Sequence, residues 1–582
     1  MRGIRARAIA ASTVACTVAC TVACTVWLLV AMLAPGVARA QCGGVPGAAS
    51  RIPTLYQQHD WTAVVQAAQG VADRSGDEDF DYGMALAHLQ RWGEARAALL
   101  AGRAACGGDK RFPVELAGVA FEQKKYPEAA RWLREALTRD PRDDYALNFA
   151  GTVYELMGNT EAALKYWNRV GKPYVAGLQV DQNLRLKRGV LERAFVFSPA
   201  AVLQQKQFLA TEVRLKSLGL YPMYEVALQA RKDGKFDAEF HAVERNGFGS
   251  NKWQALLGTL GGLPYETVYP AYFNADHVGL NIESLLRWDA EKERVWVEAA
   301  APLHKLPEWR WEMSVDGRAE NWVMRQSFTG TAPSQGSLHL RRAVAGASLT
   351  SLASGRTQWS VGAELSDRKF TRVANGPAFN AALLSGGFQA KATGSVQRLL
   401  LDVPEQRFTL EGAASSGLAR LWSNPARLYG QLQGDARAHW YPQAVGDRYE
   451  VNQRVRAGTS FGTPPFDELW MLGVERDNDL WLRGAIGTRD GRKGSAPLAT
   501  RYLLSNSDFD RRIYGNGLVT IAAGPLFDIG RAAAPTNALA PRKWLFSAGA
   551  EVKLTVLGVS AVFTYGHDLR AGTNAFYGTA AR

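Results

Sequence analysis

The second half of the chain repeats one pattern, in which apolar residues alternate with polar or charged ones. The clearest runs are Trp309, Trp311, Met313 and Val315; Leu432, Ala436, Ala438 and Trp440; and Trp544, Phe546, Ala548, Ala550, Val552 and Leu554. A β-strand places successive side chains on opposite faces, so each run predicts a strand with one apolar and one polar face.

Two architectures fit this alternation. Strands of about ten residues with this pattern are typical of a transmembrane barrel, in which the apolar face meets lipid and the polar face lines the lumen. A soluble antiparallel sandwich, with solvent on its polar face, fits equally well. Turn signals divide residues 251–582 into about 14–16 strands, which is within the range of outer-membrane barrels. The segments that precede the strands favour the barrel.

Residues 1–40 have the features of a secretory signal peptide. A basic start is followed by an apolar stretch from Ala8 to Leu33, and Ala38-Arg39-Ala40 fits a small-x-small cleavage site. The stretch is long enough for an uncleaved anchor helix, which is the alternative. No later segment is a continuous apolar run of membrane-spanning length, so we expect the rest of the chain to enter a membrane only through strands.

Only two of the five cysteines lie beyond the signal segment. Cys42 and Cys106 would survive cleavage, and two cysteines in an oxidising compartment can pair. Their spacing does not decide between a disulfide and two unpaired small residues. Neither has a neighbouring Cys or His at ligand spacing, so no metal site is predicted.

Residues 41–178 predict helical repeats. Three segments align with a period of about 34 residues, and each carries a Glu followed by Ala. These residues are Glu94, Glu128 and Glu161. Gly118 and Gly151 stand where paired helices would touch. The pattern resembles the tetratricopeptide repeat, which implies a curved surface that holds a peptide or a periplasmic protein partner, and implies no chemistry.

Residues 179–250 predict a small α/β domain. We expect a strand at Val190–Phe197, a helix at Val202–Leu218, and a hairpin of Tyr224–Ala230 with Phe236–Glu244. This order resembles the latter part of a POTRA domain. The resemblance implies that the domain accepts an extended polypeptide at its sheet edge. The alternative is a spacer that only stacks on the barrel.

Two short motifs near the end of the chain resemble a pair found in the POTRA-plus-barrel outer-membrane superfamily. That superfamily contains BamA, the two-partner-secretion translocators and the bacterial surface antigens. One motif is Leu482-Arg483-Gly484, and the other is Phe527-Asp528-Ile529-Gly530. The resemblance implies that a loop folds into the barrel, where Arg483 contacts Asp528 while Gly484 and Gly530 allow close backbone approach.

The physical chemistry of a charged loop supports this pairing. A guanidinium inside a barrel needs a partner, and a wall carboxylate offers a bidentate one. The alternative is that both charges are solvated in the lumen. Leu482 and Ala485 depart from the loop motif and Leu526 from the strand motif, which weakens the expectation of tight packing. The basic, turn-rich segment 489–494 fits a solvated loop tip.

Charge and motif content exclude several functional classes. The formal net charge is +13, but the chain contains no zinc finger, basic zipper or aromatic RNA-binding motif, so nucleic acid is not expected. Attraction to anionic lipid or lipopolysaccharide is a better use of a basic surface, and the alternative, which we prefer, is scattered charge that is only solvated. There is no nucleophile elbow, zinc-binding histidine pair or phosphate-binding loop, so neither an enzyme, a cofactor nor a catalytic residue is predicted.

Together these features predict a multidomain protein: tetratricopeptide-like helices, a small α/β POTRA-like domain and an antiparallel transmembrane β-barrel. We expect it in a bacterial outer membrane, with its N-terminal domains in the periplasm and its barrel in contact with lipid. The resemblance implies that it translocates or inserts a client polypeptide. The alternatives are a tetratricopeptide-barrel exporter of surface polysaccharide and a surface or receptor scaffold that transports nothing.

Overall fold

The computed structural model describes the chain except residues 1–50, 326–333, 375, 517, 557–558 and 582. The predicted signal peptide and Cys42 therefore lie outside the described residues. The chain divides into two compact units, residues 1–146 and 147–582, and the division falls inside α8 (Asp144–Leu156). It therefore lies within the segment predicted as repeats.

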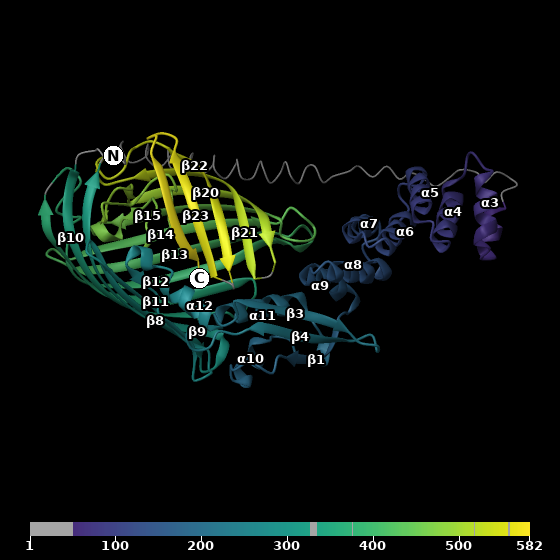
Figure 1. Cartoon of the computed structure of the whole chain (residues 1–582), viewed down its shortest axis with the longest axis horizontal. Helices are drawn as coiled ribbons and strands as arrows, with labels where there is room; N and C mark the ends of the chain where they lie inside the picture. The colour runs from purple at the N-terminus through teal and green to yellow at the C-terminus, as the bar shows by residue number, and fades with distance from the viewer. Residues whose placement is uncertain (1–50, 326–333, 375, 517, 557–558, 582) are drawn as a thin grey trace, which may run out of the picture. The chain divides into compact units, whose positions relative to one another are not determined.

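Paired helices make up the described part of the first unit (Figure 1). They are α2 (Ile52–Gln57), α3 (Trp61–Gln69), α4 (Gly76–His88), α5 (Trp92–Ala105), α6 (Arg111–Glu122) and α7 (Tyr126–Arg139). Ion pairs join α5 to α7: Arg96 Nη2 lies 2.9 Å from Glu128 Oε1, and Arg103 Nε lies 2.7 Å from Glu135 Oε1. Glu128 of the repeat pattern thus links one helix pair to the next.

The two glycines predicted at helix crossings behave differently. In the second unit α8 is followed by α9 (Thr160–Trp167), and a Cβ at Gly151 would lie 2.2 Å from Trp167 Cδ1. At Gly118 the nearest described atom would be Glu115 Oε2, 3.9 Å away. The prediction for Gly118 is therefore wrong, because its helix face meets open space. Gly83 on α4 approaches a neighbour instead, since its Cβ would lie 2.7 Å from Leu99 Cγ.

A four-stranded mixed sheet follows. Its elements are β1 (Tyr174–Val180), α10 (Arg188–Ala194), β2 (Ala201–Val202), α11 (Gln205–Ser217), β3 (Met223–Ala230) and β4 (Phe236–Val243). The strand order is β2-β1-β4-β3, with β1 parallel to β4. The predicted helix and hairpin are present. The strand predicted at Val190–Phe197 is wrong: α10 begins the segment, because Val190, Leu191 and Ala194 share one buried helical face.

The remaining strands form a sheet whose order closes into a barrel (Figure 1). The longer ones are β6 (Ala271–Ala275), β7 (Leu280–Asp289), β8 (Lys292–Leu303), β9 (Leu306–Arg325), β10 (Ser334–Ser351), β11 (Thr357–Ala374), β12 (Gly387–Val403), β13 (Phe408–Trp422), β14 (Arg427–Trp440), β15 (Tyr449–Gly462), β20 (Arg501–Gly515), β21 (Val519–Ala533), β22 (Leu545–Val556), β23 (Val559–Asp568) and β24 (Asn574–Ala581). Two-residue strands, β5 (Thr267–Val268), β17 (Thr488–Arg489) and β18 (Arg492–Lys493), bring the described total in the sheet to 18. Because β17 and β18 belong to the loop between β15 and β20, 18 − 2 = 16 strands remain for the wall, within the predicted 14–16.

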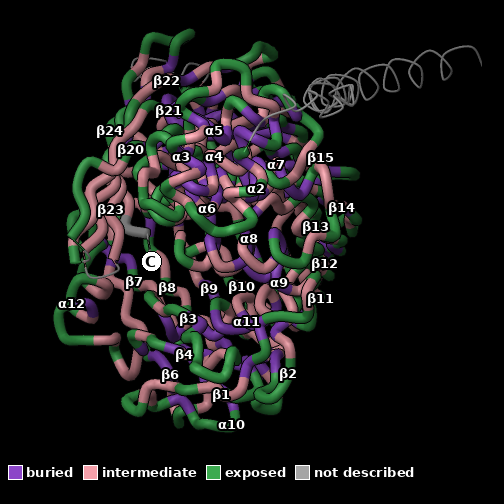
Figure 2. The backbone as a smooth tube through the Cα atoms, turned by 90° about the vertical axis from the view of Figure 1, so that its right-hand side faces the viewer, coloured by how far each residue is buried: buried purple, intermediate pink, exposed green. Residues whose placement is uncertain are grey.

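The alternating runs of the sequence lie in β9, β14 and β22. Met313, Val315 and Leu432 are exposed on the outer side, whereas Asp316 and Gln431 are buried on the inner side. Residues of different exposure follow one another along the strands (Figure 2). The wall therefore has an apolar outside and a polar inside.

Among the described helices, none combines the length and apolarity needed to cross a membrane.

Candidate functional site in the barrel lumen

A long loop, residues 463–500, connects β15 to β20 and folds across the inside of the wall. Two short ladders order it: β16 (Trp470–Met471) pairs with β19 (Leu498–Ala499), and β17 pairs with β18. The turn between β17 and β18 has positive φ at Asp490 (51°) and Gly491 (77°). Lys493 pairs in parallel with Trp322 of β9, which is far from β15 and β20 in the strand order.

Apolar packing holds this lumen loop on two sides. Leu472, Leu480 and Leu482 are fully buried in one cluster with wall residues Tyr502, Leu504 and Leu545. A second cluster contains loop residues Phe466, Met471 and Leu498 and wall residues Trp322, Leu338 and Leu340. Because Leu482 fills the first cluster, its difference from the superfamily motif is compatible with close packing.

The structure brings Arg483 and Asp528 together. Arg483 Nη2 donates to Asp528 Oδ1 at 2.6 Å, and Nε donates to the same oxygen at 3.0 Å. The Arg483 backbone N–H donates to Asp528 Oδ2 at 2.7 Å, and Asn506 Nδ2 donates to Oδ1 at 2.8 Å. Asp528 is fully buried, so these donors replace its hydration. Charge-assisted bonds of this kind fix both orientation and position.

Two further carboxylates face the same guanidinium. Arg483 Nη1 contacts Asp508 of β20, and it lies 3.6 Å from Glu551 Oε2 of β22. The loop arginine therefore meets acids on three adjacent strands. Sequence reasoning identified Asp528 alone, because only Asp528 belongs to a motif.

Close backbone approach occurs at two glycines. A Cβ on Gly484 would lie 2.6 Å from the Asp568 nitrogen, and one on Gly566 of β23 would lie 2.1 Å from the Arg483 carbonyl oxygen. At Gly530 the nearest atom would be Leu482 Cδ1, at a milder 3.3 Å. The Gly484 N–H also donates to Ser547 Oγ at 3.0 Å. Gly484 thus takes the predicted role, and the sequence reasoning missed Gly566.

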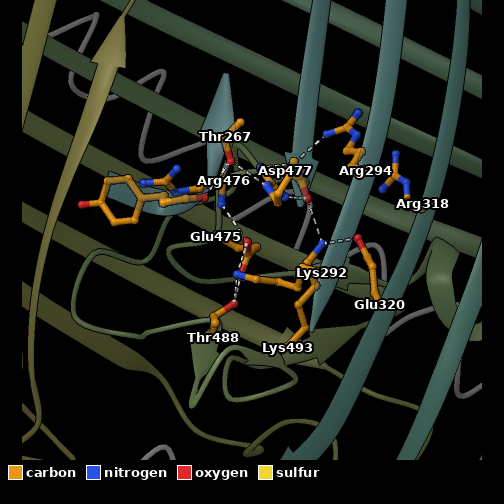
Figure 3. A network of polar contacts seen from close by, with 12 residues as sticks. Thr267, Lys292, Arg294, Arg318, Glu320, Glu475, Arg476, Asp477, Thr488 and Lys493 are labelled. Atoms are coloured by element: carbon orange, nitrogen blue, oxygen red, sulfur yellow. Dashed lines mark hydrogen bonds and ion pairs between the residues drawn. The ribbon is translucent and has the colours of Figure 1, made fainter. Parts of the chain in front are cut away.

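A second contact joins the loop to β7, β8 and β9 (Figure 3). Asp477 lies 2.9 Å from Arg287 Nη1, 2.6 Å from Arg294 Nη1 and 3.1 Å from Lys493 Nζ. Lys493 Nζ also lies 2.7 Å from Glu320 Oε1. Asp477, Arg287, Lys493 and Glu320 are nearly excluded from solvent. The acid and the lysine of the loop therefore take part in one buried network with the wall.

The basic loop tip predicted at residues 489–494 is only half correct. Arg492 is exposed and pairs with Glu291 at 3.0 Å, as a tip residue would. Lys493, the next residue, is buried in the network with Glu320. The reason is the strand alternation of the β17–β18 hairpin, which turns neighbouring side chains to opposite faces.

A third contact lies where the loop passes β10, β11 and β12. Glu468 lies 2.8 Å from Arg342 Nη2 and 3.0 Å from Lys391 Nζ, and Asp467 lies 3.1 Å from Arg368 Nε. Arg368 is the largest fully buried side chain among the described residues. Its charge is thus held by the loop acids, with help from Gln389 Oε1 at 2.5 Å.

The three contacts differ in polarity between the two sides of the barrel. Toward β7–β12 the loop presents mainly acids to basic wall residues, together with Lys493 to Glu320, and toward β20–β22 it presents Arg483 to three acids. A cavity of about 550 Å³ remains beside it, lined by charged groups such as Glu320, Asp477 and Lys493. Sequence reasoning missed the acidic contacts because their partners lie more than 70 residues away. A usable signal was the run of acids at Asp467, Glu468, Glu475, Asp477 and Asp479.

Two predictions concern residues outside this site. Cys106 is buried at the C-terminal end of α5, but Cys42 lies outside the described residues, so their pairing remains a prediction. No group of three or more His, Cys, Asp or Glu side chains is placed to hold a metal in the part of the chain that the structure describes.

No protein-family model and no curated protein sequence matches the chain. Solved structures similar to it include BamA from Haemophilus ducreyi lacking POTRA domains 1–3, with 12% identity, a TM-score of 0.41, and coverage of 70% of this chain and 84% of that one. CdiB from Escherichia coli has 10% identity, a TM-score of 0.45, and coverage of 70% and 75%. CdiB from Acinetobacter baumannii has 11% identity, a TM-score of 0.41, and coverage of 70% and 73%. These identities and TM-scores are too low to carry a functional argument, so the function is inferred from the contacts within this chain alone.

Proposed function

We propose that this protein is an outer-membrane β-barrel that translocates or inserts client polypeptides. Its helical repeats and α/β domain lie in the periplasm and recruit the client. The lumen loop is the movable part of the conduit. The contact that carries this proposal is the buried set of bonds from Arg483 to Asp528, because it holds a loop inside a polar wall.

The outer surface of the wall supports a membrane location. Met313, Val315, Leu418 and Leu428 are among the large apolar side chains exposed there. In water each would forgo the roughly 1.5–3 kcal/mol that full burial of such a side chain gives. A bilayer removes that loss. In a closed barrel the backbone N–H and C=O groups bond between neighbouring strands, so few of them would lack a partner inside the lipid.

The balance of forces on the loop supports a movable element. Much of the contact between loop and wall is made by ion pairs, such as Asp477 with Arg294 and Glu468 with Arg342. A buried ion pair contributes little net stability compared with apolar packing, because desolvation offsets most of its attraction. A passing segment that supplies its own polar groups can therefore replace these ion pairs at modest cost, while the apolar clusters around Leu482 and Phe466 resist the movement.

The α/β sheet supports recruitment by strand addition. β3 is the last strand in the order β2-β1-β4-β3, so its outer edge has no strand partner among the described residues. An extended polypeptide can bind such an edge through main-chain hydrogen bonds. Part of the edge is covered, since the Glu155 carboxylate of α8 lies beside the Leu228 N–H. The half of β3 that begins at Met223 is the better docking site.

Photocrosslinking in cells tests the proposal. A benzophenone amino acid at exposed Glu225 on β3 should form adducts with other polypeptides, and the same probe at exposed Glu192 on α10 should not. Identification of the captured species by mass spectrometry names the client. Capture of polysaccharide alone, equal capture at both positions, or recovery of the chain in the soluble periplasmic fraction would contradict the proposal.

A further inference from the structure

The short helix α12 (Lys252–Leu260), just before the first wall strands, has its apolar face turned outward. Trp253, Leu256, Leu257 and Leu260 follow helical spacing and are 68%, 47%, 44% and 37% exposed. Its other face carries small or polar side chains, and among them Gln254 is buried. A helix on a soluble domain has the reverse arrangement, because water favours its polar face.

The polar face is turned toward the barrel. Gln254 Oε1 accepts from the Ser250 N–H at 2.7 Å, which caps the start of the helix, and the Thr259 carbonyl accepts from the N–H of Tyr269, between β5 and β6, at 2.9 Å. A small cavity lies between helix and wall, lined by Gln254, Ala255, Thr259, Phe273 and Val559. The helix therefore packs on β5 and β23, where the first wall strands meet the last ones.

The exposed stripe continues into the apolar surface of the wall. Exposed Phe248 lines the cavity beneath the helix, and its ring packs edge-on against exposed Tyr272 of β6, with the centroids 5.5 Å apart. Within the helix only Lys252, at its first position, is charged. An aromatic-rich apolar surface with a cation at its margin is typical of segments in the interfacial region of a bilayer.

We propose that α12 is a lipid-contacting helix of this barrel, with its Trp253–Leu260 stripe against the acyl chains at the seam between first and last strands. The occupant is outer-membrane lipid, because the stripe is continuous with the exposed apolar wall. This inference rests on the membrane location proposed above. It goes further by assigning a membrane contact to a helix, where sequence reasoning expected contacts through strands only.

A photocrosslinking experiment on the full chain in vesicles of outer-membrane phospholipid tests this. The benzophenone probe is placed singly at Trp253, at Leu432 on the exposed side of β14, and at buried Gln254. We expect lipid adducts at positions 253 and 432 in comparable yield, and no lipid adduct at position 254. Heat-modifiable mobility on gels verifies that each variant has folded.

The three positions separate the two proposals. Adducts at 432 without adducts at 253 would overturn the role of α12 and leave the membrane barrel intact. No lipid adduct at 432 in folded protein would overturn the membrane location and this inference with it. Adducts at 253 with a second copy of this chain or with another polypeptide, in place of lipid, would assign the stripe to a protein partner and reject the inference.

Discussion

At the scale of single residues, the contrast between buried and exposed ion pairs decides which charges matter. Asp528 is fully buried and receives several donors, whereas the Arg492–Glu291 pair lies largely in solvent. Removal of one partner from a buried pair leaves an uncompensated charge, while an exposed pair is screened by water and salt. The Arg483–Asp528 pair therefore provides a test, and the Arg492–Glu291 pair made by the same loop provides its control.

We expect Asp528→Ala to destabilise the folded barrel by about 3–5 kcal/mol, the range for breaking a buried pair. The loss should appear as a lower temperature at which the folded gel band disappears. Arg492→Ala should change stability by less than about 1 kcal/mol. The exchange of Arg483→Asp with Asp528→Arg should rescue only part of the loss, because Asp508 and Glu551 also face position 483. Equal stability of all these variants would exclude a structural role for the contact.

A carboxyl pair on α9 and β12 gives a pH-dependent contact. Burial, together with the neighbouring Asp402, raises the pKa of Glu161 to about 8. Both Asp402 carboxylate oxygens are buried without a hydrogen-bond donor, and Gln205 donates to Glu161 at 3.2 Å. Glu212 lies nearby and adds negative charge. Protonated Glu161 is therefore the form that the folded protein favours.

The sign of the pH effect follows from linkage. Because the folded pKa lies above the ordinary value of 4.5, this contribution to stability is complete below that value and is lost as the pH rises toward 8. We expect the thermal midpoint of the wild type to fall between pH 5 and pH 8.5, and Glu161→Gln to reduce that fall. Calorimetry at the two pH values measures it. An identical pH dependence in the variant would show that Glu161 does not titrate in this range.

At the scale of elements, the spacing of apolar residues predicted those strands and helices that depend on the local sequence pattern. Alternation located β9, β14 and β22, and helical spacing located the paired helices. The strand expected at Val190–Phe197 failed because its β-branched and aromatic residues also fit a helical face, with Arg188 and Glu192 paired at 2.8 Å. The partners of Asp477 and Glu468 could not be predicted, because the chain alone does not state which strands a 38-residue loop will cross.

The close approach of the loop to β23 gives an element-scale prediction. Gly566→Ala would place a Cβ within contact of the Arg483 carbonyl oxygen, so either the loop or the strand must shift. Overpacking of this kind typically costs about 1–3 kcal/mol. Gly434→Ala on β14 is the matched control, since its Cβ would meet no atom within 4 Å. The thermal midpoints of the two variants should differ accordingly, and equal midpoints would mean that the loop is not held against β23.

At the scale of the whole molecule, the loop holds the lumen through contacts that are spread around the wall. Acids at Asp467, Glu468 and Asp477 meet the cationic strands, and Arg483 meets the acidic ones. Release of one contact leaves the others in place, so the barrel need not unfold for the loop to move. The described wall strands pair with one another, and the loop adds few backbone contacts to them, namely β18 with β9 and Thr500 with Ala533 of β21 and Ser460 of β15.

This separation predicts a conductance change without loss of the barrel. In Asp477→Ala, the cations Arg287, Arg294 and Lys493 would lose the acid that all three contact and keep only part of their balancing charge, from Glu320, Asp316 and Glu475, so this part of the loop should leave the wall. We expect larger single-channel currents in planar bilayers than for the wild type, with folded gel mobility retained. Asp490→Asn in the exposed turn of the same loop is the control, since Asn tolerates the left-handed backbone there, and it should conduct like the wild type. Currents unchanged in Asp477→Ala would show that this contact does not obstruct the pore, whereas loss of the folded band would show that loop and wall fold as one unit.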